Sequence, residues 1–223
     1  MTHAADHRVV LVGAEAPFGA EIARRLTGAG HLVMALDAPA VHRWLTQADA
    51  TGPVRALVVN APVARSVLRF DAVDDAAFAQ ALQTQLVDVV QVIQAVLPSM
   101  QAGARIVLVG TRGHLGAWGG VHLMAASAAL VAMARSMALE LAPEGIRVNM
   151  VAAEFVHDRG DTPALRAGVA HAVEFLCAPE LGISGETLLV DSQAALRMSE
   201  SRNAADSPIT AAPVPGPAGH PPT

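Results

Sequence analysis

Residues Ala129–Val151 read ALVAMARSMALELAPEGIRVNMV and carry the clearest pattern of secondary structure in the chain. The first half of this stretch belongs to a long apolar run with helical character, Gly119–Leu141. The triplet Pro143-Glu144-Gly145 ends that run, because proline and glycine interrupt helices. The apolar segment Arg147–Val151 then has the composition of a buried strand. The stretch therefore predicts a helix, a tight turn and a strand in immediate succession.

The same alternation extends over most of the chain. Further strands are predicted at Arg8–Val12, Leu32–Leu36, Arg55–Val59, Arg105–Val109 and Thr187–Val190. Further helices are predicted at Gly19–Leu26, Ala40–Ala48, Ala76–Leu97, which Pro98 closes, and Ala164–Leu176. The strands lack a polar face and are separated by helices, which is typical of a parallel sheet covered on both sides. We therefore expect an α/β protein with a doubly wound parallel sheet of about six strands.

Composition excludes several classes of function. The chain has 223 residues, of which 52% are hydrophobic, and its net charge is −5, so no nucleic-acid partner is expected. Apolar runs are broken before the roughly 18 residues that a membrane span needs, and no secretory signal is visible. The single cysteine, Cys177, cannot form an internal disulfide, which favours a reducing compartment and a cytoplasmic location.

The two ends of the chain differ in composition. Residues 1–197 are expected to form one domain, whereas residues 198–223 are rich in proline, alanine and serine and are expected to be disordered. The chain contains no tyrosine, and all 15 basic residues are arginine, so it contains no lysine either. No group of His, Cys, Asp and Glu has the spacing of a zinc site, so no metal is expected.

Read in this order, the chain resembles a short-chain dehydrogenase/reductase of the 3-oxoacyl-carrier-protein reductase type. Ala129–Val151 matches the family's helix, turn and strand almost letter for letter, and VGAEAPFGAEIARRL, LVVNAP, QAVLPSM, ARIVLVGTRG and GETLLVD support it. The resemblance covers Arg8 to Asp191 and implies a Rossmann-like fold. Only Ala38–Pro53 separates the second and third strands, so one strand-helix unit of the family is expected to be missing.

The family reduces carbonyls with a tyrosine acid, a lysine, a serine and an asparagine. The resemblance places Leu123 at the tyrosine, Ser127 at the lysine, Thr111 at the serine and Gln85 at the asparagine. Leu123 can neither donate nor accept a proton, so general acid catalysis is lost at that position. We therefore expect no catalytic residues of the family type.

The cofactor positions are also altered. The family's three fingerprint glycines correspond to Gly13, Pro17 and Gly19, and proline lacks the N–H that would face a phosphate, although Pro17 could simply start the helix. Asp37 is equally compatible with binding the adenosine ribose of NAD and with an ordinary strand-end turn. Asn60 is retained beside the cofactor position, but Pro62 replaces a glycine. We expect no cofactor, or NAD if any, bound at these vestigial positions.

Three further departures bear on the site. Ala153 and Glu154 replace a Pro-Gly pair near the nicotinamide position, and the stretch HDRGDTPAL after Phe155 is shorter than the family's substrate loop. His114 and His122 flank the old catalytic region, and His122 could replace the missing acid. A solvated or capping histidine is the more common role at a helix start.

The helices Ala76–Leu97 and Gly119–Leu141 pair across a two-fold axis in the family. Their retained apolar character, including Leu123, Leu130, Met133, Met137 and Leu141, predicts a homo-oligomer or a hetero-oligomer with an active relative. We therefore expect a non-catalytic subunit, or pseudoenzyme. An NAD(P)-dependent oxidoreductase with an altered site and a nucleotide-sensing regulator remain as alternatives.

Overall fold

A computed structural model describes residues 8–37, 40, 41, 43, 52–61, 68–154 and 162–191 of the chain. Its centre is a parallel sheet of six strands in the order β2-β1-β3-β4-β5-β6. The strands are β1 (Arg8–Val12), β2 (Leu32–Leu36), β3 (Val54–Asn60), β4 (Met100–Thr111), β5 (Arg147–Ala153) and β6 (Thr187–Val190). Every neighbouring pair of strands runs parallel. The predicted α/β fold with a doubly wound parallel sheet is confirmed.

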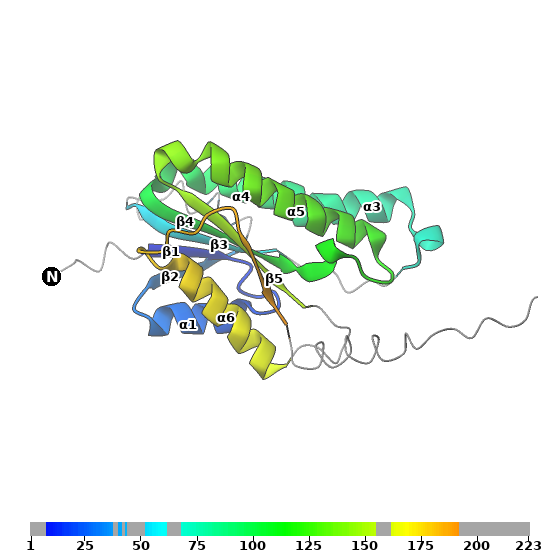
Figure 1. The fold of residues 1–223 in the computed structure, drawn as a ribbon, viewed down its shortest axis with the longest axis horizontal. Coiled ribbons are helices and arrows are strands. Elements are labelled where there is room, and N and C mark those ends of the chain that lie inside the picture. The colour runs from blue at the N-terminus through cyan, green and yellow to red at the C-terminus, as the bar shows by residue number, and fades with distance from the viewer. Residues whose placement is uncertain are drawn as a thin grey trace, which may run out of the picture. The chain divides into compact units, whose positions relative to one another are not determined.

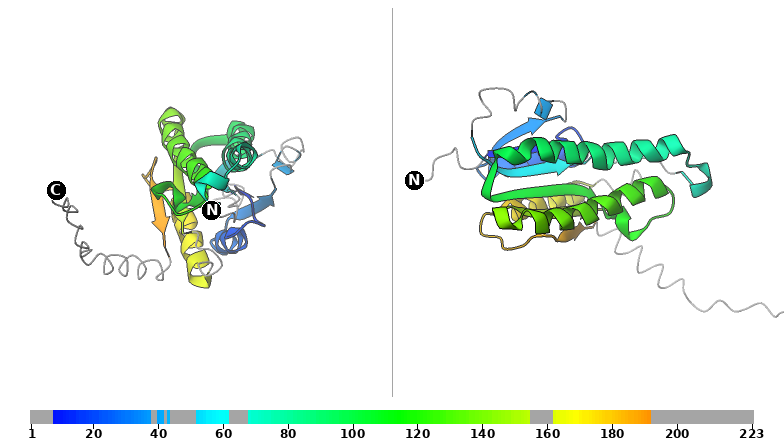
Figure 2. Two further views of the ribbon diagram at one scale, coloured as in Figure 1. Left: turned by 90° about the vertical axis from the view of Figure 1, so that its right-hand side faces the viewer. Right: turned by 90° about the horizontal axis from the view of Figure 1, so that it is seen from above.

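Helices cover both faces of the sheet, as Figures 1 and 2 show. On one face lie α1 (Gly19–Gly28) and α6 (Pro163–Cys177), and on the other lie α3 (Asp75–Leu82), α4 (Asp88–Val96) and α5 (Val121–Glu140). Short 3-10 turns are formed by Phe70–Ala72, Leu97–Ser99, Arg112–Leu115 and Ala142–Glu144.

Two apolar cores result from this layering. Alternate residues of β1 serve different cores, because successive side chains of a strand point to opposite faces. Val10 and Val12 pack with α4 and α5, whereas Val9 and Leu11 pack with α1 and α6. Since both faces are buried, the central strands are mostly apolar on both sides, which explains the absence of alternation in the sequence.

The predicted helix Ala76–Leu97 is present as a helical run that contains a π turn. It begins at Asp75, and a π-helical turn over Gln83–Val87 separates α3 from α4. The side chain of Asp74 caps α3 by accepting a hydrogen bond from the backbone N–H of Ala77 at 2.7 Å. Leu97 lies in a 3-10 turn with Pro98, one residue after α4 ends at Val96.

The predicted helix Gly119–Leu141 is shorter than expected, because Gly119 and Gly120 adopt positive φ angles of 75° and 67°. The side of α5 that packs against the sheet differs from the prediction. Leu123, Leu130 and Leu141, predicted as interface contacts, are buried within the chain, and Met133 and Met137 pack against the same core. The assignment of the three leucines to an interface was wrong, because apolar residues occur on several sides of α5 and their spacing does not mark the inner face.

The outward face of α5 carries small and apolar residues together with the exposed Arg135, Ser136 and Glu140. Ala128 and Ala132 are exposed, Val121 is 37% exposed and Leu139 is 79% exposed. By length and composition α5 could also cross a membrane, because its mean hydropathy reaches 1.4, but 44% of that window is buried inside the fold. The expectation that no apolar run of the chain is long enough to span a membrane was therefore too strict. A core helix passes the same test, so this feature is weak evidence for a span.

Several predicted features lie outside the described residues. These are Pro62, most of the segment between β2 and β3 with its expected helix Ala40–Ala48, the loop after Glu154, and the tail 198–223. Among the described residues, β2 is an edge strand, and its Leu32 is 53% exposed.

Candidate functional site

The candidate site lies where the parallel strands end at their carboxyl termini. The chain leaves β1 toward β2 on one side, and β3 lies on the other side of β1. Ligands of doubly wound proteins bind in the crevice at such a topological switch point. The turn after β1 and the end of β3 meet there.

The glycines of this turn are required by its own packing. Gly13 has a φ of +82°, and a Cβ at this position would lie 2.3 Å from the backbone oxygen of Asn60. A Cβ at Gly19 would lie 2.5 Å from the backbone oxygen of Gly13. Real Cβ atoms essentially never approach this closely. The two retained fingerprint glycines are therefore explained without any ligand.

Asn60 holds the turn from the end of β3. Its Nδ2 donates hydrogen bonds to the backbone oxygens of Gly13 at 2.9 Å and Pro17 at 2.7 Å. Asn60 is only 3% exposed, so both amide hydrogens are engaged inside the protein. The amide thus ties the turn to the sheet.

Pro17 does not start helix α1, which corrects one reading of the sequence. The helix begins two residues later at Gly19, and Phe18 between them adopts a left-handed conformation with a φ of 74°. Phe18 is buried in the core beside α1, which holds this conformation in place. Pro17 therefore lies within the turn, where the family has its second glycine.

Asp37 serves as a turn residue at the end of β2. Its Oδ1 accepts a hydrogen bond from the backbone N–H of Ala40 at 2.5 Å. Arg43 approaches the same carboxylate at 3.9 Å on the surface. Asp37 therefore has the contacts of an ordinary turn residue at the end of a strand.

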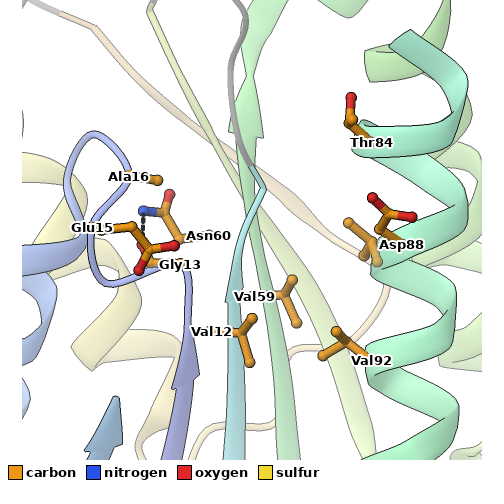
Figure 3. Close-up of a pocket in the computed structure, with 10 residues that line it drawn as sticks. Val12, Gly13, Glu15, Ala16, Val59, Asn60, Thr84, Asp88 and Val92 are labelled. Carbon is orange, nitrogen blue, oxygen red and sulfur yellow. Dashed lines mark hydrogen bonds between the residues drawn. The ribbon is translucent and has the colours of Figure 1, made fainter. Parts of the chain in front are cut away.

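A cavity of about 130 Å³ opens beside the turn (Figure 3). Its walls come from the ends of β1 and β3 and from the π turn and α4. The lining residues are Val12, Gly13, Glu15, Ala16, Val59, Asn60, Thr84, Asp88, Val89 and Val92. The sequence did not single out Glu15, Thr84 or Asp88, because no motif connects the turn to the helix across the sheet.

The structure brings together the residues at the family's serine and lysine positions. The hydroxyl of Ser127 donates to the backbone oxygen of Thr111 at 2.9 Å, and both residues are buried. The hydroxyl oxygen of Thr111 accepts from the backbone N–H of Gly113 at 3.2 Å. Nδ1 of His114 lies 3.3 Å from the same Thr111 backbone oxygen. These polar groups hold the start of the loop between β4 and α5.

Leu123 and Gln85 complete the set of family positions. Leu123 is 5% exposed and presents only carbon to its surroundings. Gln85 lies in the π turn, is 5% exposed, and its Nε2 has no hydrogen-bond partner. Leu123, which the resemblance places at the family's tyrosine, therefore offers no proton donor.

His122 differs from the expected solvated or capping residue. It is 3% exposed, and its Nδ1 has no hydrogen-bond partner. Helix α5 packs against α3 and the π turn on this side. Since successive helical residues point about 100° apart, His122 and Leu123 face different neighbours.

Two features at the end of β5 and β6 were not predicted as contacts. Glu154 is nearly buried, and its backbone N–H donates to the oxygen of Val190 at 2.9 Å. Arg112 forms an ion pair with Asp191 at 2.6 Å, which joins the loop after β4 to the end of β6. Neither contact has a local sequence signal, because each joins distant segments.

The described part of the chain contains no candidate metal site, and its single cysteine is buried. No group of three or more His, Cys, Asp and Glu residues there could hold a metal ion. Cys177 is buried, and this burial raises the pKa of its thiol to about 12. A thiol with such a pKa is a poor nucleophile near neutral pH.

Pro17 makes the turn after β1 poorer in donors for the pyrophosphate of a dinucleotide than a glycine at that position would. Pro17 offers no N–H, and the N–H groups of Gly13 and Ala16 already donate to the oxygens of Leu36 and Gly13. Glu15 adds a carboxylate to the turn, where a second negative charge would be repelled.

Comparisons with known proteins agree with this fold. A family model described as enoyl-(acyl carrier protein) reductase matches residues 2–167. The 3-oxoacyl-[acyl-carrier-protein] reductase FabG of Vibrio harveyi is 33% identical over 165 residues, which cover 64% of this chain and 67% of that protein. The (2S)-[(R)-hydroxy(phenyl)methyl]succinyl-CoA dehydrogenase subunit BbsC of Thauera aromatica is 31% identical over 207 residues, 82% of each chain.

Solved structures show the same fold. One is the NADPH-bound short-chain oxidoreductase of Pseudomonas aeruginosa PAO1 with an atypical catalytic center. It superposes with a TM-score of 0.68 at 23% identity, covering 83% of this chain and 95% of that one. The matched proteins belong to a family that typically binds NAD(P). The family model, the two relatives and the parallel sheet together establish that this chain belongs to the short-chain dehydrogenase/reductase family and is similar to its 3-oxoacyl-carrier-protein reductases.

Proposed function

We propose that this chain is a non-catalytic subunit of a short-chain dehydrogenase/reductase assembly. The observation that carries the proposal is the pair Leu123 and Ser127. Leu123 supplies no proton, and the Ser127 hydroxyl already donates to the Thr111 backbone. Because the chain has no tyrosine or lysine anywhere, no other residue of those types can take over the two roles.

The proposal includes weak or absent dinucleotide binding. Pro17 removes one N–H from the turn after β1, the N–H groups of Gly13 and Ala16 are already engaged, and Glu15 adds a negative charge there. Micromolar affinity corresponds to about 8 kcal/mol of binding free energy, much of which comes from phosphate contacts in such folds. We expect dissociation constants of about millimolar or weaker for NAD(H) and NADP(H).

The assembly is proposed to form through the outward faces of α3, α4 and α5. Six of the nine exposed large hydrophobic residues of the described chain lie on these helices or in the turns and loops that precede them. They are Phe70, Val87, Leu115, Trp118, Val121 and Leu139. Exposed apolar surface of this kind marks interaction sites, and a stable interface needs more than about 1,000 Å² in total.

The partner is a second copy of this chain or an active relative. The similar protein BbsC is described as a subunit of a dehydrogenase, which supports a subunit role here. The lone thiol of Cys177 is buried and unpaired, consistent with the cytoplasmic location that we propose.

A matched pair of variants tests the assembly. Ala128 on the outward face of α5 and Ala20 on α1 are both exposed helical alanines. We expect Ala128→Arg to dissociate the oligomer in sedimentation, because it buries an unpaired charge at the interface, whereas Ala20→Arg leaves it intact. A soluble monomer at micromolar concentration, with no partner in extracts of the source organism, would overturn the proposal.

One observation favours a second candidate, an oxidoreductase with an altered acid. His122 is buried beside Leu123 in sequence and has an unpartnered ring nitrogen. In this case the purified chain would turn over substrate, and His122→Ala would abolish that activity.

A further inference from the structure

The cavity beside the turn after β1 has apolar walls and a polar rim. Four valines form the walls: Val12 and Val59 from the strands, Val89 and Val92 from α4 (Figure 3). A cavity of about 130 Å³ with such walls can take a small apolar group.

The rim carries two carboxylates on opposite sides. Glu15 extends from the turn and Asp88 from the start of α4, as Figure 3 shows. Gln83 Nε2 donates to Oδ1 of Asp88 at 2.8 Å, which orients that carboxylate. None of the described residues lining the cavity is arginine, lysine or histidine. The local charge is therefore negative.

The other polar side chains of the rim act as acceptors. The Asn60 amide hydrogens are bonded to the oxygens of Gly13 and Pro17. The Thr84 hydroxyl donates to the backbone oxygen of Gln80 at 3.0 Å. The N–H groups of Gly13 and Ala16 are also engaged within the protein. A ligand that complements this rim must bring hydrogen-bond donors.

We propose that this cavity binds a small organic cation, an amine or amidinium on an apolar body. The apolar body contacts the valines, and the cationic donors face Glu15 and Asp88. This inference goes beyond the proposed function, because it holds whether or not the chain assembles. It reverses the charge preference expected of a pocket that would hold a phosphate-bearing cofactor.

Three probes of equal ring size and different charge test the proposal. Benzamidine is cationic, benzamide is neutral and benzoate is anionic near pH 7. Calorimetric or ligand-detected NMR titration of the full chain should give the affinity order benzamidine, benzamide, benzoate. Added salt should weaken the binding of benzamidine because it screens the charge interaction.

Charge-neutralising variants localise the effect. Glu15→Gln and Asp88→Asn should each lower the benzamidine affinity about two- to five-fold, as for partly exposed ion pairs, and leave benzamide unchanged. Asp75→Asn, an exposed residue of α3 outside the cavity, is the matched control and should change neither affinity. Thermal unfolding of each variant verifies that the fold is retained. Benzoate binding as tightly as benzamidine, equal loss in the Asp75→Asn control, or no saturable binding of any probe would overturn the proposal.

Discussion

Replacing Asn60 should destabilise the fold without altering any nucleotide affinity. Asn60→Ala removes two buried hydrogen bonds, of 2.9 and 2.7 Å, and leaves the oxygens of Gly13 and Pro17 without these donors. Each bond contributes about 0.5–1.5 kcal/mol, and unsatisfied buried carbonyls add to the loss, so we expect about 2–4 kcal/mol in total. For a domain of this size, that corresponds to a fall in Tm of about 4–16 °C.

Chemical denaturation of the wild type, Asn60→Ala and Asn60→Asp measures this effect. The aspartate of Asn60→Asp would place a carboxylate against two carbonyl oxygens, so this variant should be at least as unstable near neutral pH. Its stability should recover partly in acid, where the carboxyl group can donate one hydrogen bond. If Asn60→Ala costs less than about 0.5 kcal/mol but abolishes a measurable dinucleotide affinity, the structural role argued for Asn60 is refuted.

Further expectations concern the thiol, helix α5 and the cofactor. Because burial raises the pKa of Cys177 to about 12 from its ordinary 9.0, its contribution to stability should be complete below pH 9 and lost as the pH rises toward 12. Alkylation at pH 8 should accordingly be much slower in the native protein than in urea, and equal rates would contradict the burial. Leu130→Ala should cost about 2–5 kcal/mol of unfolding free energy, whereas Leu139→Ala should cost less than about 0.5 kcal/mol in the separated subunit. Calorimetric titration with NADH and NADPH should show no saturable binding at micromolar concentrations, and a micromolar dissociation constant would contradict the reading of the turn after β1.

The six strands could be predicted because each is a short apolar run bounded by glycine, proline or polar residues. Their bounds differ from the structure mainly at the ends. Strand β4, for example, begins five residues before the predicted Arg105 and ends at Thr111. The π turn over Gln83–Val87 could not be predicted, because the sequence there continues the helical spacing of its neighbours.

The orientation of α5 relative to the sheet could not be predicted from the sequence. Apolar residues occur on several sides of α5, and its polar residues are too few to show which side faces the sheet. Leu123 and Leu130 therefore lie in the core and not at the predicted interface. The burial of His122 follows from the same packing and has no signal in its neighbours.

The turn after β1 was predicted in part. Gly13, Pro17 and Gly19 could be aligned on the family fingerprint, but alignment does not reveal which partner each glycine approaches. The close contact between Gly13 and Asn60, and the carboxylates of Glu15 and Asp88 across the cavity, arise from segments distant in the sequence. Contacts of this kind are set by the tertiary fold.

Turnover by the isolated chain tests the central claim most directly. The purified protein is incubated with NADH or NADPH and a 3-oxoacyl thioester, and cofactor oxidation is compared with that of a Gln85→Ala/Thr111→Ala double variant. We predict equal rates at background level, because no proton donor occupies the position of Leu123. Substrate-dependent oxidation well above that of the double variant, in a preparation free of other reductases, would contradict the account.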